Sequence, residues 1–411
     1  MRPARRRVFS YTILPMSVAV PDAVDRATVF DALVVGAGPA GSYLGYLLAK
    51  SGRRVAIIDK ERFPRDKVCG GAVSRKAIDL IDFDIAPVVH RSVRGAFLTF
   101  GNRSTVVKDE ERAGVCTVVR SEFDQFLLDK ARAAGAQFFP EANFLGAVEH
   151  DQTVTVRTSR GDFEASLVCA ADGAASTVRA KMFGKNVVRY VPSLEALVHV
   201  RDSEMSRLDG RAVFDFGVMP RGYGWIFPKS DHLNVGVYSP FGGHALRAHL
   251  DRFISLYRSM RHPVSIRYLG FVIPVENAAK RFQHGRIWLI GDAAGLVECI
   301  FGEGIYFALK SAVVAADAIE RGGDAPDSLL YTKSLNQELL PELRASQWIG
   351  KALYRFQSFS FSHLVLNDRV NRDFAGLITG EVGYRQCLSL TARNAFKWLR
   401  RSPSADHGIA L

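Results

Sequence analysis

Long hydrophobic runs are absent from this chain of 411 residues. No stretch of about 18 consecutive apolar residues occurs, so the sequence predicts no membrane-spanning helix. The chain also lacks an internal repeat. Its basic residues form no recognisable DNA- or RNA-binding motif, so we expect no nucleic-acid partner.

Cysteine is scarce as well. The five cysteines are odd in number and widely spaced: Cys69, Cys116, Cys169, Cys299 and Cys387. Such a set fits neither a disulfide framework nor a zinc site, so we predict free thiols and no bound metal. Free thiols indicate a reducing compartment, and we expect a cytoplasmic protein.

The overall composition is that of a folded protein. Hydrophobic residues make up 48% of the chain and charged residues 23%, both ordinary values. The length allows about two or three domains with a large core. The formal net charge of +12 favours an anionic partner, such as cofactor phosphates, an acidic lipid surface or a phosphorylated substrate.

The first 27 residues differ from the rest, because a basic arm precedes a mildly apolar segment. Arg6, Arg7 and Phe9 match part of a twin-arginine export signal. The apolar part is short, Pro15 interrupts it, and no A-x-A cleavage site follows. We therefore favour a flexible N-terminal extension, or a true start at Met16, over an export signal.

Residues 33–59 carry the most informative pattern: a short apolar strand, a glycine-rich turn, a helix, and a second strand that ends at Asp59. Gly36, Gly38 and Gly41 give the turn a G-x-G-x-x-G spacing. Gly36 permits the tight turn, Gly38 lets the backbone approach a pyrophosphate, and Gly41 allows close packing of helix on strand. Asp59 can accept a hydrogen bond from a ribose hydroxyl. The stretch predicts a dinucleotide site.

Two later segments have related character. Asp172 and Gly173 follow a strand and precede a short helix, and a GDAAG segment from Gly291 to Gly295 is followed by the run 302–304, Gly-Glu-Gly. Such aspartates are also common in surface turns. Their order and spacing after the first motif favour a shared site instead.

The element pattern predicts an α/β plus α+β protein. A Rossmann-type cofactor domain begins the fold, strand patterns dominate the middle, and αβ character returns from Arg286. The cofactor domain would therefore be discontinuous, with an antiparallel-sheet substrate domain and a helical C-terminal region beside it. The expected bounds are 1–27 for the extension, 28–75, 115–186 and 275–330 for the cofactor domain, 76–114 and 187–274 for the substrate domain, and 331–411 for the C-terminal region.

The three segments together resemble the FAD-dependent superfamily typified by aromatic hydroxylases. The resemblance implies that Asp292 touches the ribityl chain and that Arg120, placed just before a helix at Ser121, lies near the cofactor. A helix starting near Glu303 would direct its N-terminal dipole at the flavin and stabilise the charge of its reduced form. The implied cofactor is FAD, and the implied cofactor-binding residues are Gly36, Gly38, Pro39, Ala40, Gly41, Asp59, Lys60, Cys69, Gly70, Gly71, Arg120, Asp172, Gly173, Gly291, Asp292, Gly302, Gly304 and Ile305.

Within that superfamily the chain resembles the geranylgeranyl reductase family. The resemblance spans roughly Asp31 to Arg400 and is carried by PRDKVCGGAVS, by YGWIFPK ending at Lys229, by the second flavin segment, and by LITGEVGYRQCL. It implies reduction of carbon–carbon double bonds in an isoprenoid chain. No second dinucleotide motif is present. The electrons would therefore come from NADPH that binds only transiently, or from a small redox protein.

The resemblance implies four catalytic residues: Cys69, Tyr223, Trp225 and Phe227. The three aromatic residues alternate on a strand, so their rings share one side and could wall an apolar tunnel. Ordinary core packing would give the same pattern. Cys69 could position the alkene, donate a proton or respond to redox state, and a small buried apolar residue is the alternative.

Other readings stay open at this point. A flavin monooxygenase or halogenase is the second candidate, although the W-x-W-x-I-P motif of halogenases is missing. Ala72 and Cys299 depart from the family pattern, and a Cys69–Cys299 redox pair would suit a redox sensor. The basic amphipathic stretch 384–402 could dock on a membrane surface or pack as a solvated helix.

Overall fold

The cofactor half of the fold is built on a mostly parallel sheet. The computed structural model describes residues 28–103, 105–109, 114–185, 187–277, 280–323, 328–365 and 375–389. The sheet runs in the order β19 (Gln283–His284), β20 (Ile287–Leu289), β13 (Val168–Ala170), β2 (Ala32–Val35), β3 (Val55–Ile58) and β9 (Gln137–Phe139). Only the β19–β20 pair is antiparallel. Every residue of β2 and β3 is buried, as apolar strands of a parallel sheet require.

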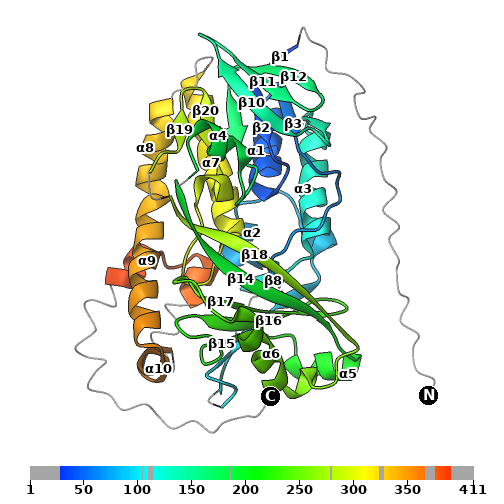
Figure 1. Ribbon diagram of the computed structural model, residues 1–411, viewed down its shortest axis with the longest axis vertical. Coiled ribbons are helices and arrows are strands. Elements are labelled where there is room, and N and C mark those ends of the chain that lie inside the picture. Colours follow the sequence, from blue (N-terminus) through cyan, green and yellow to red (C-terminus); the bar gives the residue numbers. More distant parts are fainter. Residues whose placement is uncertain are drawn as a thin grey trace, which may run out of the picture.

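Helices cover this sheet. In Figure 1, α1 (Pro39–Lys50) lies between α7 (Ile305–Gly322) and α3 (Arg120–Ala133), and it packs against both. A smaller sheet lies at one end, in the order β1 (Val29–Phe30), β12 (Gly161–Ala165), β11 (Val154–Thr158) and β10 (Phe144–Glu149), with α4 (Thr177–Met182) packed on β10.

The second half is a largely antiparallel sheet of seven strands. Their order is β18 (Ser265–Asn277), β14 (Val188–His199), β17 (Leu233–Tyr238), β16 (Tyr223–Pro228), β15 (Ala212–Asp215), β6 (Gly95–Thr99) and β7 (Thr105–Asp109). One face packs on α6 (Leu246–Leu256) around a separate core that includes Ile226, Val235 and Phe253. The other face points toward the cofactor half.

Shorter elements join the halves. A three-stranded sheet of β4 (Ala72–Ser74), β8 (Val115–Thr117) and β5 (Arg91–Val93) sits between them. The remaining elements are α2 (Arg75–Ile78), η1 (Ala86–Val88), α5 (Asp202–Met205), η2 (Ser206–Leu208), η3 (Arg258–Met260) and η4 (Gly291–Ala294).

The C-terminal helices form a column along one side of Figure 1. They are α8 (Ser328–Glu338), α9 (Leu340–Arg355), α10 (Gln357–Ser360) and η5 (Phe361–Val365), followed by helical residues 375–379 and 384–389. Among the described residues, no helix has the length and hydropathy needed to cross a membrane.

The predicted fold class is confirmed: a Rossmann-type sheet, an antiparallel sheet and C-terminal helices are all present. The domain boundaries stay a prediction. Two helix starts were predicted slightly wrongly. α3 begins at Arg120 rather than Ser121, and α7 begins at Ile305 because Gly302 has a positive φ of 69° and turns the chain just before it. The extension 1–27 and most of the stretch 384–402 lie outside the described residues.

A glycine on β17 tests how tightly the second sheet is packed. A Cβ added at Gly236 would lie 2.1 Å from Cζ2 of Trp225, whose indole is fixed by a 2.8 Å hydrogen bond from Nε1 to Asn234 Oδ1. Gly236→Ala should therefore lower the free energy of unfolding by about 1–3 kcal/mol in urea denaturation.

The matched control is Gly270→Ala on the nearby β18, where the nearest atom to an added Cβ is Leu194 Cδ1 at 3.5 Å. That variant should stay within about 0.5 kcal/mol of the parent. Equal stabilities of the two variants would contradict the packing described here.

Candidate active site

A cavity of about 510 Å³ lies between the two halves of the molecule. Its walls come from segments that are far apart in sequence: the turn before α1, the loop 65–72, the start of α3, the turn after β13, the strands β16 and β18, and the turn before α7. The carboxyl ends of parallel strands open into such crevices, which is where α/β proteins bind ligands.

The first glycine-rich turn closes one end of this cavity. Gly36 has a φ of 104°, and a Cβ there would lie 2.4 Å from Ala171 O; a Cβ at Gly41 would lie 1.8 Å from Gly36 O. Only glycine fits these two positions. At Gly38 the nearest atom to an added Cβ is Arg65 Nη2 at 3.7 Å, so this backbone borders open space in the cavity.

Asp59 lies beside this turn and is only 8% exposed. Its Oδ2 accepts a hydrogen bond from Ala37 N at 2.7 Å, and its Oδ1 accepts one from Glu61 N at 2.9 Å. Burial raises the pKa of Asp59, although these backbone donors oppose the shift. The carboxylate therefore braces the turn, and its contact with a ribose stays a prediction.

Two helix N-termini face the same cavity. Gly38 caps α1 and Gly304 caps α7, and neither helix has a side-chain cap. The first-turn N–H groups are therefore available to an anionic group, and each helix dipole places partial positive charge at the cavity.

The turn after β13 provides an acidic side chain. Asp172 Oδ2 accepts hydrogen bonds from Thr177 N at 2.7 Å and Val178 N at 3.1 Å. Its Oδ1 is buried in the cavity wall and has no hydrogen-bond partner among the described residues. Burial raises the pKa of this carboxyl, and the Ser176 side chain and the backbone donors oppose the shift.

A cluster of charged side chains lies at the start of α3. Arg120 binds Asp124 through Nε and Nη2, at 2.7 and 2.8 Å, and Arg65 Nη1 lies 3.0 Å from the same fully buried carboxylate. Two guanidinium groups thus share one carboxylate, which leaves a net positive charge. Burial alone would lower the pKa of Arg120, but Asp124 outweighs burial and the net shift is upward.

Lys67 adds to this charge. Burial and the nearby Arg120 lower the pKa of the Lys67 ammonium to about 8, and Asp292 opposes the shift only in part. Burial raises the pKa of Asp292, while Lys67 is the first of the cations that favour its ionised form. Lys67, Arg120 and Asp292 therefore form one interacting group at the cavity.

The loop that carries Cys69 is held from two sides. Lys229 Nζ, at the end of the aromatic strand, donates to Gly70 O at 2.7 Å, Gly71 O at 3.1 Å and Val118 O at 3.0 Å. Burial lowers the pKa of Lys229 to about 8, against the opposing effect of Cys69 and Glu195. On the other side, Cys69 N donates to Glu195 Oε1 at 3.1 Å.

The aromatic residues of β16 form the opposite wall. The ring centroids of Trp225 lie 5.9 Å from Tyr223 and 6.1 Å from Phe227, and all three rings line the cavity. Tyr223 Oη donates to Phe301 O at 2.6 Å. Because this hydroxyl and the Trp225 N–H are bonded within the protein, the wall offers a ligand mainly carbon surface.

A second, smaller cavity of about 110 Å³ continues from this wall. It shares five lining residues with the first cavity: Val115, Phe214, Phe227, Phe301 and Ile378. Its other lining side chains are largely aliphatic or aromatic, including Leu98, Phe216 and Leu353. The site therefore passes from a charged half at the glycine turn to an apolar half beyond the aromatic wall.

The cavity gathers most of the predicted site residues. Those that line it are Gly36, Gly38, Pro39, Ala40, Asp59, Lys60, Cys69, Gly70, Gly71, Arg120, Asp172, Gly173, Tyr223, Trp225, Phe227, Asp292, Gly302, Gly304 and Ile305. Gly41 and Gly291 lie behind the wall, where Gly291 packs near Ala40 and Ala308. Cys69 is a free, half-buried thiol.

Cys299, considered as a redox partner of Cys69, does not line either cavity. Its thiol is also free, and its Sγ lies 4.0 Å from Ser346 Oγ on α9. The two sulfurs therefore face different surroundings.

The sequence interpretation gave no role to several residues of the site. Glu195, Lys229 and the Arg65–Asp124 pair are buried charged groups whose partners lie far away in the chain. Only Lys229 among these residues lies in a motif noted in the sequence, because it ends YGWIFPK. Phe214 and Phe301 also line both cavities, and nothing in their local sequence marks them.

Known proteins resemble this chain in sequence and in fold. Residues 29–204 match the family model described as an FAD binding domain. An uncharacterised protein of Methanosarcina barkeri is 30% identical over 340 residues, which cover 81% of this chain and 86% of the relative. A digeranylgeranylglycerophospholipid reductase of Methanococcus vannielii is 24% identical over 91% of this chain and 96% of its own length. A chloroplastic geranylgeranyl diphosphate reductase of Oryza sativa is 28% identical over 82% and 79%.

The chain belongs to the geranylgeranyl reductase family. Members of this family are FAD-dependent oxidoreductases, and the fold of this member agrees. A solved structure of a geranylgeranyl bacteriochlorophyll reductase-like protein from Thermoplasma acidophilum superimposes with a TM-score of 0.72 at 21% identity, covering 90% of this chain and 98% of that one. Halogenase PltM in complex with phloroglucinol and FAD superimposes with a TM-score of 0.64 at 16% identity, covering 88% and 85%.

The cavity of this geranylgeranyl reductase family member fits FAD. The open backbone at Gly38 and the uncapped start of α1 suit a pyrophosphate. The unpartnered Oδ1 of Asp172 and the uncapped start of α7 offer further polar contacts. The residues that predict an FAD site from sequence therefore converge on one cavity.

Removing the buried ammonium tests how the cysteine loop is held. Lys229→Met should lower the free energy of unfolding by about 2–4 kcal/mol, because three carbonyl oxygens lose their shared donor. Urea denaturation measures the loss, and flavin absorbance reports whether FAD stays bound.

Lys181→Met serves as the control, since Lys181 Nζ also donates to a carbonyl, Leu145 O at 2.7 Å, but on the exposed surface. It should change stability by less than about 0.5 kcal/mol. A loss at Lys229 as small as that at Lys181 would show that this clamp does not stabilise the fold.

Proposed function

We propose that this protein reduces carbon–carbon double bonds of an isoprenoid chain. The observation that carries the proposal is that the main cavity and a smaller apolar cavity lie side by side at the aromatic wall and share five lining residues. A long hydrocarbon fits such a shape, whereas a compact aromatic substrate would leave the second cavity empty. The relatives named geranylgeranyl diphosphate reductase and digeranylgeranylglycerophospholipid reductase support the same substrate class.

Different residues around the cavity would have different roles. The chemistry that bound, reduced FAD would supply is hydride donation. The glycine turn, Asp172 and the start of α7 would hold the cofactor. The rings of Tyr223, Trp225 and Phe227 would hold the isoprenoid chain in place and exclude water from it, since their polar atoms are bonded within the protein.

Reduction of an alkene also requires a proton. Cys69 Sγ is the thiol that lines the cavity, and Gly71 N donates to it at 3.4 Å. We assign the S–H of Cys69 as the proton donor to the alkene carbon. The thiolate that remains would be stabilised by this backbone donor and by the facing Arg120.

Anaerobic turnover tests the function directly. The FAD-loaded protein is reduced with dithionite, so the assay does not depend on whether NADPH or a small redox protein is the natural donor. Geranylgeranyl diphosphate is then added. Flavin reoxidation and a product heavier by two hydrogen atoms, detected by mass spectrometry, are the expected results.

Cys69→Ser is the matched variant, because serine keeps the size but is a far weaker acid. It should retain FAD and lose about 10²- to 10⁴-fold in the rate of alkene reduction. An unchanged rate would remove Cys69 from the mechanism. Turnover that requires oxygen, without anaerobic alkene reduction, would instead identify a monooxygenase or halogenase and overturn the proposal.

The second cavity makes a separate prediction about chain length. Ala212 is 2% exposed on β15 and lines this cavity. Ala212→Leu would fill part of it, so turnover of geranylgeranyl diphosphate should fall at least about tenfold, a loss of about 1.4 kcal/mol in transition-state stabilisation. Turnover of the shorter geranyl diphosphate should hardly change. An equal loss for both substrates would contradict the placement of the chain.

A further inference from the structure

The outer face of α9 and α10 exposes large aromatic side chains. Trp348 is 64% exposed, Phe356 64% and Phe359 46%. They alternate with exposed basic residues on the same face. We define the α9–α10 surface by six exposed side chains: Arg344, Trp348, Lys351, Arg355, Phe356 and Phe359.

We propose that the α9–α10 surface docks on an anionic phospholipid bilayer. The sequence 343–367 contains no Asp or Glu, so no acidic side chain of this segment would repel lipid phosphates. Aromatic residues interleaved with Lys and Arg are typical of surfaces that lie at the membrane interface, where rings enter the headgroup region and cations meet anionic lipids.

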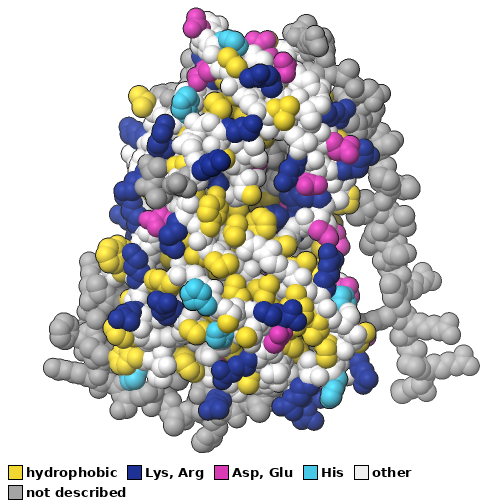
Figure 2. Space-filling model, in the orientation of Figure 1, with side chains coloured by type: hydrophobic (Ala, Val, Ile, Leu, Met, Phe, Trp, Pro, Cys, Tyr) yellow, Lys and Arg dark blue, Asp and Glu magenta, His cyan; other side chains and the backbone are white. Residues whose placement is uncertain are grey.

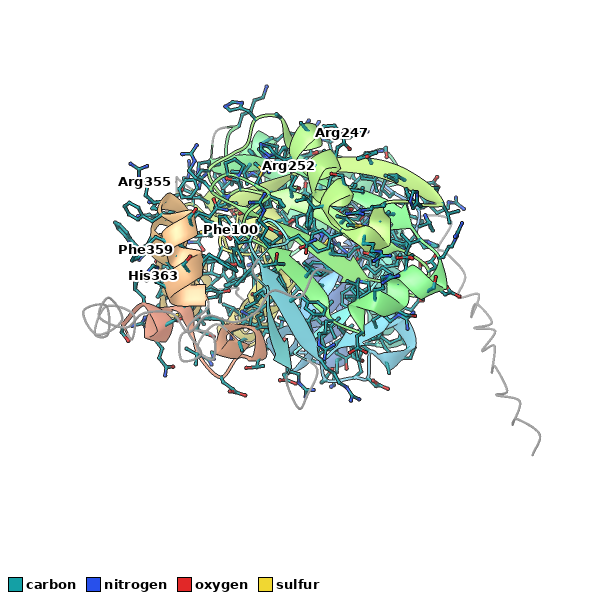
Figure 3. All side chains as sticks on the ribbon, turned by 90° about the horizontal axis from the view of Figure 1, so that it is seen from below. Phe100, Arg247, Arg252, Arg355, Phe359 and His363 are labelled. Atoms are coloured by element: carbon teal, nitrogen blue, oxygen red, sulfur yellow. The ribbon has the colours of Figure 1, made fainter. Side chains whose placement is uncertain are left out.

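The cations lie close to the aromatic rings they would accompany into the interface. Lys351 Nζ is 5.1 Å from the ring centroid of Trp348, and Arg355 Cζ is 5.9 Å from that of Phe356. Figure 3 shows Arg355, Phe359 and His363 projecting from one edge of the molecule. In Figure 2, hydrophobic and basic side chains lie next to each other along the margin where Figure 1 places α9 and α10.

The opposite face of these helices is fixed to the body of the protein. Tyr354 Oη donates to Ile300 O at 2.6 Å. Gln357 Nε2 donates to Met219 O and Gly222 O, at 2.9 and 2.8 Å, and its Oε1 accepts from Arg221 N at 2.6 Å. The aromatic residues are therefore presented on a rigid support, so docking requires no rearrangement of these helices.

This surface also lies close to the apolar part of the site. Leu353 lines the second cavity from the buried face of α9, between the exposed Lys351 and Arg355. If the proposed function holds, on which this step rests, a lipid substrate would leave the bilayer beside the cavity that receives its chain. Docking itself does not depend on that function.

Vesicle binding tests the proposal with the full-length, FAD-loaded protein and no substrate. Flotation is measured with vesicles of phosphatidylcholine alone and with vesicles containing about 30% phosphatidylglycerol. We expect binding to the anionic vesicles, weakened by high salt. The double variants Lys351→Glu/Arg355→Glu and Trp348→Ala/Phe356→Ala should each lower the partition coefficient at least about tenfold.

Arg157→Glu/Arg160→Glu is the charge-matched control. Arg157 lies on β11 and Arg160 in the turn after it, both are exposed, and Figure 1 shows β11 and β12 at the opposite end of the molecule from α10. It should bind vesicles like the parent. Circular dichroism and bound flavin verify that each variant is folded.

Three results would overturn the proposal: no binding of the parent to anionic vesicles, binding unaffected by both α9 variants, or an equal loss in the control. A parent dimer that Trp348→Ala/Phe356→Ala converts to a monomer would also overturn it, and would assign the surface to a second copy. Because binding is measured without turnover, its failure is distinct from failure of the anaerobic assay.

Discussion

One buried ammonium group joins the two halves of the active site. Lys229 extends from the end of the aromatic strand and donates to three carbonyl oxygens, two in the cysteine loop and one just before α3. An ammonium group has three hydrogens and all are used, so none of these segments can shift without losing a hydrogen bond. Glu195 binds the same loop from the other side, through Cys69 N. The position of Cys69 against the aromatic wall depends on this pair of buried charges.

The site is thereby divided between two kinds of surroundings. In the polar half of the cavity, the Arg65–Asp124–Arg120 cluster and Lys67 lie among several aspartates, and two helix N-termini offer N–H groups suited to phosphates. Beyond the aromatic wall, the second cavity offers almost only carbon surface. The charged region therefore suits the phosphates of FAD, and the apolar region suits a hydrocarbon chain beside the cofactor.

The parts of this site that were predictable from sequence are those with local constraints. Gly36 and Gly41 have neighbours that forbid a side chain, so their spacing is visible in a single stretch. The alternation of Tyr223, Trp225 and Phe227 likewise follows from the geometry of one strand. Lys229 and Glu195 could not be assigned in this way, because their partners come from other elements. Asp124 pairs with Arg120 on the same helix, but its second cation, Arg65, comes from a distant loop. The sequence also does not show which face of α9 and α10 stays exposed, since the face a helix buries depends on what packs against it.

The order of strands in the cofactor sheet has a consequence for biosynthesis. β20 pairs with β13, and β13 pairs with β2, although these strands begin at Ile287, Val168 and Ala32. Most of the antiparallel sheet is encoded between β13 and β20. During translation, one edge of β13 must therefore stay unpaired until β20, which ends at Leu289, has left the ribosome. Such long-range closure is slow and prone to aggregation, so molecular chaperones and translation speed should strongly affect the yield of active protein.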